Sequence, residues 1–187
     1  MATLRHQVAN LVSVPLTMVR LSMQKLIWPR HLYFSGIQRF SPNVVVDIDR
    51  KSKLVFGKQV SIHSCSRLAT TSGGELTIGN RVSFNVGCIV TCRSRISIGN
   101  HVTFGPNVML FDHNHTMNPE IGVQSKEFQL GEIEIGDNTW IGAGSIILSG
   151  ARIGKNCVIA AGSVVKGKVP NNTMLIQKRE NFHKQIG

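Results

Sequence analysis

Aliphatic residues recur at every sixth position through the carboxyl-terminal part of the chain. A period of six fits neither a helix, whose apolar side repeats roughly every 3.6 residues, nor a simple strand, whose side chains alternate at every second residue. It predicts a β-solenoid in which each six-residue unit forms one short strand and one corner. The positions are Ile135, Ile141, Ile147, Ile153, Ile159 and Val165.

The same phase is present earlier in the chain, interrupted by small slips that we interpret as loops at corners. Three units make a triangular coil of about 18 residues, so Ile135 should lie directly above Ile153, and Ile141 above Ile159. The period alone does not give the hand of the coil. The earlier positions are Ile78, Phe84, Ile98, Phe104 and Leu110.

The first thirty residues follow a different period, with apolar residues at steps of three and four. This spacing predicts an amphipathic helix, with Pro15 as a kink or an early boundary. The longest stretch without an ionisable residue, 7–19, is shorter than the roughly 20 residues that span a bilayer, so we expect no membrane span. The apolar positions are Leu4, Val8, Leu11, Val12, Leu16, Val19, Met23, Leu26 and Ile27.

Three interpretations of this helix remain open on the sequence. The helix packs on the main domain, or the acid-free segment is an organellar transit peptide. In the third interpretation it lies on an anionic membrane surface, with Arg5, Arg20, Lys25 and Arg30 facing the headgroups.

The length of 187 residues fits one domain with a terminal appendage. We divide the chain into a helical segment at 1–40, a solenoid domain at 41–173 with a protruding loop at 112–132, and a basic tail at 174–187. The four cysteines include no CxxC pair, which favours buried free thiols in a reducing, cytoplasmic compartment.

The surplus of positive charge, 21 Lys and Arg against 10 Asp and Glu, is concentrated at the two ends of the chain. Residues 1–46 carry five basic residues and no acid, and residues 151–187 carry seven and one, whereas the middle is neutral. Aromatic residues make up only 6% of the chain and no nucleic-acid motif is present, so we expect no nucleic-acid partner. A phosphorylated small molecule fits the charge better.

The block IGDNTWIGAGSIILSGARIGKNCVIAAGSVVKGKVPNN carries a Trp before an IGAGS unit, a VIAAGSVV coil and a closing VP. It resembles the hexapeptide-repeat acyltransferases, which include galactoside, maltose, xenobiotic and polysaccharide O-acetyltransferases. The resemblance covers about 55–173. It implies a left-handed parallel β-helix, a homotrimer, acetyl-coenzyme A as the donor and an active site between neighbouring subunits.

The segment that breaks the six-residue phase carries two histidines, His113 and His115. A neutral imidazole can accept the proton of an attacking hydroxyl, and in an extended segment both side chains would share a face. Spacing alone does not choose between them. The string NHTM resembles the segment around the general base of xenobiotic acetyltransferases, which implies that His115 is the base, with His113 the second choice.

The resemblance also implies acceptor-binding residues. Asn85, in IGNRVSFNVG, falls at the position of an acceptor-contacting asparagine, and Trp140 would form a wall of the acceptor pocket with its ring facing outward. Where galactoside acetyltransferases have an acidic pair, this chain has Thr91, Cys92 and Arg93. The acceptor is therefore expected to be bound differently.

Small residues in the last coils would let the pantetheine arm of acetyl-coenzyme A approach the backbone, and basic residues of the carboxyl end would meet its phosphates. The ending Leu175–Glu180 departs from the family's usual glycine, proline and arginine. No metal is expected. The predicted donor-binding residues are Gly142, Ala143, Ala160, Ala161, Lys166, Lys168, Lys178 and Arg179.

Taken together, these features predict an acetyl-coenzyme A-dependent O-acetyltransferase that acts on a sugar or a polysaccharide precursor. A xenobiotic acceptor is the alternative within the same chemistry. A zinc enzyme of the gamma carbonic anhydrase type, using His101, His113 and His115, and a non-catalytic coil are the rivals from other classes.

Overall fold

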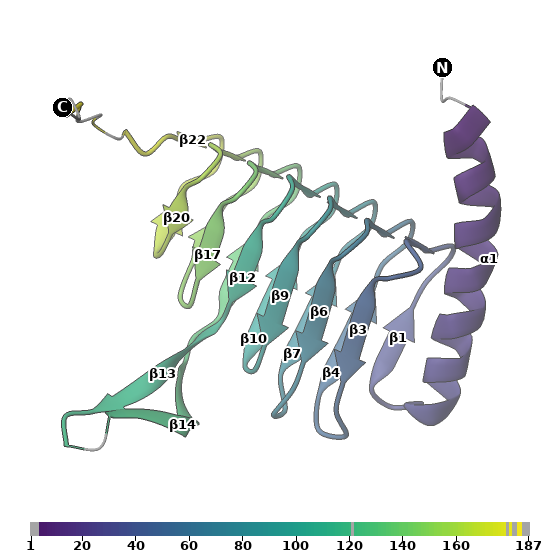
Figure 1. Cartoon of the computed structure of the whole chain (residues 1–187), viewed down its shortest axis with the longest axis horizontal. Helices are drawn as coiled ribbons and strands as arrows, with labels where there is room; N and C mark the ends of the chain where they lie inside the picture. The colour runs from purple at the N-terminus through teal and green to yellow at the C-terminus, as the bar shows by residue number, and fades with distance from the viewer. Residues whose placement is uncertain (1–3, 121, 179, 181–182, 185–187) are drawn as a thin grey trace.

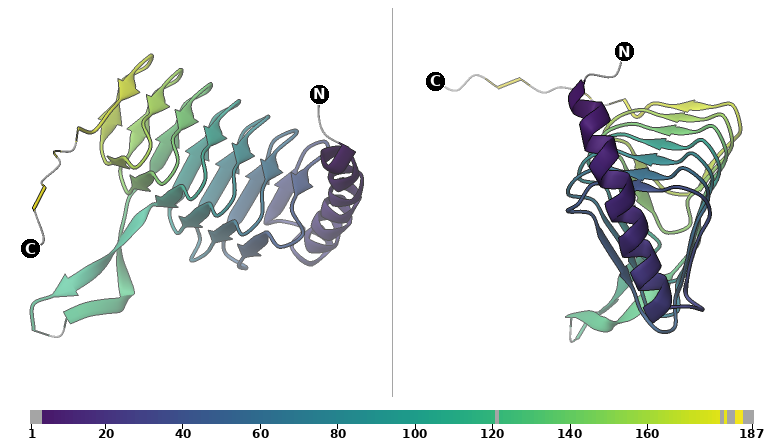
Figure 2. Two further views of the ribbon diagram at one scale, coloured as in Figure 1. Left: turned by 45° about the horizontal axis from the view of Figure 1, so that its top comes forward. Right: turned by 90° about the vertical axis from the view of Figure 1, so that its right-hand side faces the viewer.

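A computed structural model describes residues 4–120, 122–178, 180 and 183–184. A single helix, α1 (Leu4–Ile27), stands at one end of a three-sided parallel β-solenoid, and a hairpin projects from its side (Figures 1 and 2). This is the left-handed β-helix that the resemblance predicts.

The solenoid has three faces, each a parallel sheet. The first face consists of β1 (Leu32–Phe34), β4 (Lys53–Phe56), β7 (Glu75–Ile78), β10 (Arg95–Ile98), β15 (Ile133–Ile135), β18 (Arg152–Ile153) and β21 (Lys168–Val169). The second face consists of β2 (Arg39–Phe40), β5 (Ser61–Ile62), β8 (Ser83–Phe84), β11 (Thr103–Phe104), β16 (Trp140–Ile141), β19 (Val158–Ile159) and β22 (Met174–Leu175). The third face consists of β3 (Val45–Ile48), β6 (Arg67–Thr70), β9 (Ile89–Cys92), β12 (Met109–Phe111), β17 (Ile146–Leu148) and β20 (Val164–Val165).

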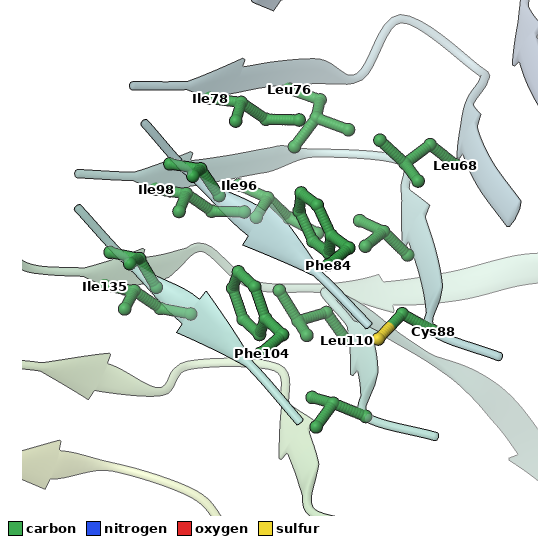
Figure 3. Close-up of a cluster of buried hydrophobic side chains, with 14 of the residues drawn as sticks. Leu68, Leu76, Ile78, Phe84, Cys88, Ile96, Ile98, Phe104, Leu110 and Ile135 are labelled. Atoms are coloured by element: carbon green, nitrogen blue, oxygen red, sulfur yellow. The ribbon is translucent and has the colours of Figure 1, made fainter. Parts of the chain in front are cut away.

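The parallel register confirms the stacking predicted from the period. Ile135 pairs with Ile153 on the first face and Ile141 with Ile159 on the second. Each of these aliphatic side chains is buried. The core continues through the earlier coils, where the rings of Phe84 and Phe104 stack with centroids 4.5 Å apart (Figure 3). The six-residue spacing thus reports directly which side chains fill the solenoid.

The solenoid extends further toward both ends than the predicted boundaries. Its first coil begins at Leu32, inside the segment 1–40 that we assigned to the helix, and β22 lies inside the predicted tail 174–187. The first coil has fewer regular six-residue units, which hides it in the sequence, although Leu32 and Phe40 are buried like the later core residues.

The helix α1 closes the amino-terminal end of the solenoid, contacting β1 and β2 (Figure 2). It runs past Pro15, which is therefore not its boundary. The Thr17 hydroxyl accepts a hydrogen bond from Phe40 N at 2.9 Å, and its single proton is shared between Ser13 O at 2.6 Å and Phe40 O at 3.1 Å. Leu21, one turn further, is buried in the core.

The packed side of α1 is not the stripe identified in the sequence. The described members of that stripe are exposed, and the buried side is formed instead by Thr17 and Leu21. The helix does pack on the main domain, but it is turned so that its more regular apolar stripe faces away from the solenoid. The Thr17 hydrogen bonds to the first coil explain this rotation, because they satisfy buried backbone groups that an aliphatic residue would leave unpaired.

The protruding segment is a two-stranded antiparallel hairpin between β12 and β15. Its strands are β13 (His113–Asn118) and β14 (Gly122–Leu130), with an irregularity between His115 and Thr116. Figure 1 shows it extending from the edge where the third face ends. No helix in the described part of the chain combines the length and the continuous apolarity that crossing a bilayer requires.

Candidate active site

The histidine hairpin leaves the solenoid at the edge between the third and first faces. There β12 lies directly beside β9, so the residues that follow the two strands are neighbours. Asp112 follows β12 and Arg93 follows β9. The start of the hairpin and the corner of the preceding coil therefore lie next to each other at this edge.

Asp112 is fully buried, and its carboxylate contacts several groups at this edge. Its carboxylate accepts hydrogen bonds from the backbone N–H groups of Arg93 at 2.9 Å and Ser94 at 2.7 Å. One of its oxygens also lies 3.0 Å from His113 Nδ1. Because a carboxylate can only accept, this contact places the proton on Nδ1 and leaves Nε2 as the basic nitrogen of a neutral His113.

Phe128 on β14 brings the two histidines together. Its ring centroid lies 5.3 Å from that of His113 and 4.8 Å from that of His115. Both imidazoles therefore share one face of the hairpin, as the extended segment predicts. The guanidinium of Arg93 covers the same ring at 4.0 Å and donates to Ser72 Oγ at 2.9 Å. One aromatic ring is thus in contact with two imidazoles and a cation.

The two histidines differ in exposure. The His113 side chain is only 11% exposed, whereas His115 is exposed to solvent. His113 is held by a buried carboxylate, and His115 is positioned where an incoming molecule can reach it.

Cys92 lies beneath this cluster. Burial, with a further contribution from the negative charge of Asp112, raises the pKa of the Cys92 thiol well above its usual range. The thiol therefore stays protonated at neutral pH and is not an activated nucleophile. Imidazole nitrogen and carboxylate oxygen are the groups available here for proton transfer.

The predicted acceptor-binding residues lie on another part of the solenoid. Trp140 is on β16 of the second face, and the residue is 55% exposed, which agrees with the predicted outward direction. Asn85 is exposed at the edge between the second and third faces, where its Oδ1 accepts a hydrogen bond from Val86 N at 2.8 Å.

The predicted small donor-binding residues share that second–third edge. Ala143 follows Gly142 at one corner, and Ala160 and Ala161 form the corner of the next coil. The two corners stack so closely that a Cβ at Gly142 would come within 2.5 Å of Ala161 N. Only a glycine fits at position 142, and the corners present backbone rather than large side chains.

Two of the predicted basic residues lie away from that edge, Lys166 at the third–first edge and Lys168 on β21 of the first face. Lys178 is exposed beyond β22, next to Gln177, whose side chain exchanges hydrogen bonds with the backbone of Val164 on β20, so the chain has passed the second–third edge there. Arg179 lies outside the described residues. Within one chain, Lys166 and Lys168 therefore face a different side of the solenoid from the small residues.

The three histidines that the zinc alternative requires also do not lie together in one chain. His101 lies at the edge between the first and second faces, away from the hairpin that carries His113 and His115. In the described part of the chain, no three His, Cys, Asp or Glu side chains are grouped closely enough to hold a metal ion.

Two separate groups of candidate residues thus exist in one chain. The imidazole cluster is at the third–first edge, whereas Trp140 and Asn85 are on the second face and at the second–third edge. An open groove on the first face, lined in part by Glu75 and Arg95, includes neither hairpin histidine.

Sequence reasoning did not assign a functional role to three residues of the imidazole cluster. Asp112 stands directly before His113, and this adjacency was the available signal. Arg93 was noted only as a departure from the family pattern. Phe128 joins the cluster through the hairpin register, His115 with Phe128, which the sequence does not reveal.

Comparison with known protein families agrees with the repeat pattern. Residues 132–167 match the model of the bacterial transferase hexapeptide, six repeats. This segment therefore consists of hexapeptide repeats. Part of this chain is 36% identical over 106 residues to the galactoside O-acetyltransferase of Lactococcus lactis, covering 57% of this chain and 51% of that protein. The chain spans about half the length of the curated relatives it matches.

Solved structures share the fold of this chain. The maltose O-acetyltransferase of Clostridium difficile is 25% identical with a TM-score of 0.51, covering 82% of this chain and 69% of that one. The N-acyltransferase AntD of Bacillus cereus, solved with dTDP and 3-hydroxybutyryl-CoA, is 18% identical with a TM-score of 0.66. The second match covers 89% of this chain and 88% of AntD.

Proposed function

We propose that this hexapeptide-repeat protein transfers an acetyl group from acetyl-coenzyme A to a hydroxyl of a sugar or polysaccharide precursor. The observation that carries the proposal is the imidazole cluster at the solenoid edge, in which an exposed His115 lies against Phe128, and Phe128 also contacts a His113 held by Asp112. The galactoside and maltose enzymes and AntD, which was solved with a CoA thioester, support the donor and the saccharide class of acceptor.

In the proposed reaction His115 is the general base. Its neutral imidazole takes the proton of the acceptor hydroxyl while the oxygen attacks the thioester carbonyl. The new C–O bond forms as the C–S bond breaks, and the coenzyme A thiolate leaves and takes up the proton from the imidazolium. Such a base accelerates the reaction about 10²- to 10⁴-fold.

Asp112 and His113 are positioning residues in this account. The buried carboxylate fixes the His113 ring, and that ring meets the edge of Phe128 at an interplanar angle of 80°. Phe128 in turn supports His115, whose ring is tilted by 48° against it. His113 is also the second candidate for the base, because its Nε2 is left as a proton acceptor by the contact with Asp112.

The complete site is proposed to lie between copies of a homotrimer. In one chain the histidines are on the third–first edge, whereas Trp140, Asn85 and the small corners that would receive the pantetheine arm are on the second face and the second–third edge. When three solenoids pack side by side, one edge of each copy faces another edge of its neighbour. The hairpin of one copy would then meet the acceptor wall and donor groove of the next.

The test is a thiol-release assay with acetyl-coenzyme A across a panel of sugar, oligosaccharide and antibiotic acceptors. We expect turnover with a saccharide, and a loss of about 10²- to 10⁴-fold in kcat for His115→Ala. Asn114→Ala is the matched control, because this exposed residue lies between the two histidines and should leave kcat unchanged. Full activity of His115→Ala together with loss in His113→Ala would transfer the role of base to His113.

A further inference from the structure

The side of α1 that faces away from the solenoid is apolar along its described length. Its large side chains are strongly exposed, Leu26 to 83%. They recur at steps of four and three residues, so they form one continuous row along the helix. We name this row the outer stripe; it comprises Val12, Leu16, Val19, Met23, Leu26 and Ile27.

In an ordinary amphipathic helix the apolar side is the side that packs on the protein, whereas the outer stripe is an apolar side that remains exposed. The opposite side of α1 is already packed on the first coil through Thr17 and Leu21, and Trp28 continues the packing just after the helix. Helices that are apolar on two sides are normally covered on both. Single exposed hydrophobic residues are common on protein surfaces, but a continuous row of six indicates a binding surface.

The charge around the outer stripe indicates the chemistry of its partner. Residues 1–46 contain five Lys and Arg and no acid. Arg30 is exposed just beyond the end of the helix. Arg20 and Lys25, which we expected to face headgroups, instead contact the protein, because Arg20 Nη1 donates to Val44 O and Lys25 Nζ donates to Pro29 O, each at 2.6 Å. A second copy of α1 would bring the same positive charges together, whereas an anionic surface would pair with them.

We infer that α1 binds an anionic lipid surface through the outer stripe. The helix crosses the end of the solenoid, and the coils all lie on one side of it (Figure 2). A flat bilayer can therefore reach the stripe without touching the coils. Tyr33, which is 41% exposed and lies under Lys25 Nζ at 3.9 Å, adds an aromatic residue of the kind enriched at the interface.

In the bound state α1 would lie in the headgroup region, with its apolar side chains entering the acyl boundary and the exposed Arg30 meeting lipid phosphates. The solenoid would point away from the membrane. This inference rests on α1 and the residues just after it, and does not depend on the proposed acetyl transfer.

The experiment is flotation of the full chain with two kinds of vesicle, phosphatidylcholine alone and phosphatidylcholine mixed with phosphatidylglycerol. We expect binding to the mixed vesicles, weakened by salt, and little binding to phosphatidylcholine alone. The double variant Val19→Gln/Met23→Gln should lower binding about tenfold or more, because two apolar side chains no longer enter the lipid. Arg30→Gln should lower it roughly fivefold.

Met174→Gln is the matched control. Met174 is 62% exposed and Met23 60%, but Met174 lies on β22 at the far end of the solenoid, so its replacement should leave vesicle binding unchanged. Far-ultraviolet circular dichroism and thermal unfolding verify that each variant folds. Absence of binding to both vesicles would overturn the inference, as would an equal loss in Met174→Gln. Self-association of the chain that depends on the stripe, without vesicle binding, would overturn it in favour of an interface between copies.

Discussion

The hydrogen bonds of Asp112 connect the core of the solenoid to the candidate chemistry. One carboxylate joins the backbone of the preceding coil, through Arg93 and Ser94, to the imidazole of His113. A single residue thus stabilises a corner and fixes a ring next to the proposed base. These two roles give different predictions for substitutions at this edge.

Replacing Asp112 with asparagine should lower both stability and turnover. The amide nitrogen cannot accept a hydrogen bond, so a buried N–H donor loses its partner at a cost of about 1–3 kcal/mol. The His113 ring also loses its fixed tautomer, and we expect kcat to fall about tenfold or more with little change in the KM for acetyl-coenzyme A. Urea unfolding and steady-state kinetics measure the two effects.

The matched control for this substitution is Asp49→Asn. Asp49 lies on the same edge in the first coil, where its carboxylate accepts from the backbone of Lys51 and Ser72. Its replacement should lower stability without lowering kcat. An equal fall of kcat in both variants would mean that Asp112 acts only by holding the fold together.

Asp49 also gives a pH-dependent prediction. Partial burial opposes ionisation, but hydrogen bonds from the Ser52 hydroxyl and from the backbone of Ser72 and Lys51 outweigh it and lower the pKa of Asp49 below its usual 3.8. A carboxyl whose pKa is lowered by folding stabilises the protein above the pKa of the unfolded chain and loses this effect as the pH falls through its folded value.

We therefore expect the difference in unfolding free energy between the native chain and Asp49→Asn to be constant above about pH 5 and to shrink below about pH 4. Urea titrations over this pH range measure it. A difference that stays the same down to the lowest pH would contradict the assigned hydrogen bonds.

At the scale of elements, α1 shows which features the spacing of apolar residues predicts and which it does not. Steps of three and four residues predict the helix, because the same spacing places apolar residues on one side of it. They do not predict which side packs, since this depends on partners far along the chain. Thr17, a polar residue outside the predicted stripe, is buried because Phe40 offers both a donor and an acceptor.

Thr17→Val tests this account of the helix. Valine has nearly the same shape but leaves the Phe40 N–H without its partner, so stability should fall by about 1–3 kcal/mol. Thr17→Ser keeps the hydroxyl and should lose markedly less. Thermal or urea unfolding distinguishes them; equal losses in the two variants would show that the methyl group, not the hydrogen bonds, holds the helix.

The hairpin is the second element that the sequence predicted only in part. The loss of the six-residue phase after Leu110 revealed an insertion with two histidines. It did not reveal that Phe128 returns beside His115, because antiparallel register depends on the turn and on an irregularity between His115 and Thr116. The candidate base was therefore predictable, whereas the aromatic ring that supports it was not.

At the scale of the whole molecule, the repeat predicts the architecture well. Inward aliphatic residues such as Ile135 and Ile141 pair in register with the equivalent residues of the next coil, Ile153 and Ile159, so the six-residue period predicts the stacking. The distribution of site residues over different edges was not predictable from the period. It leaves the proposed site divided within one chain, and this division is the reason for our proposal that neighbouring copies complete it.

Mixing two variants tests this central claim most directly. His115→Ala and Trp140→Ala chains are each expected to be nearly inactive alone, and they are produced together so that they assemble at random. If each site takes its imidazole from one copy and its tryptophan wall from the next, about one quarter of the sites in the mixed trimers contain both residues and activity returns to about that fraction. Activity that stays at the level of the single variants would contradict a site shared between copies.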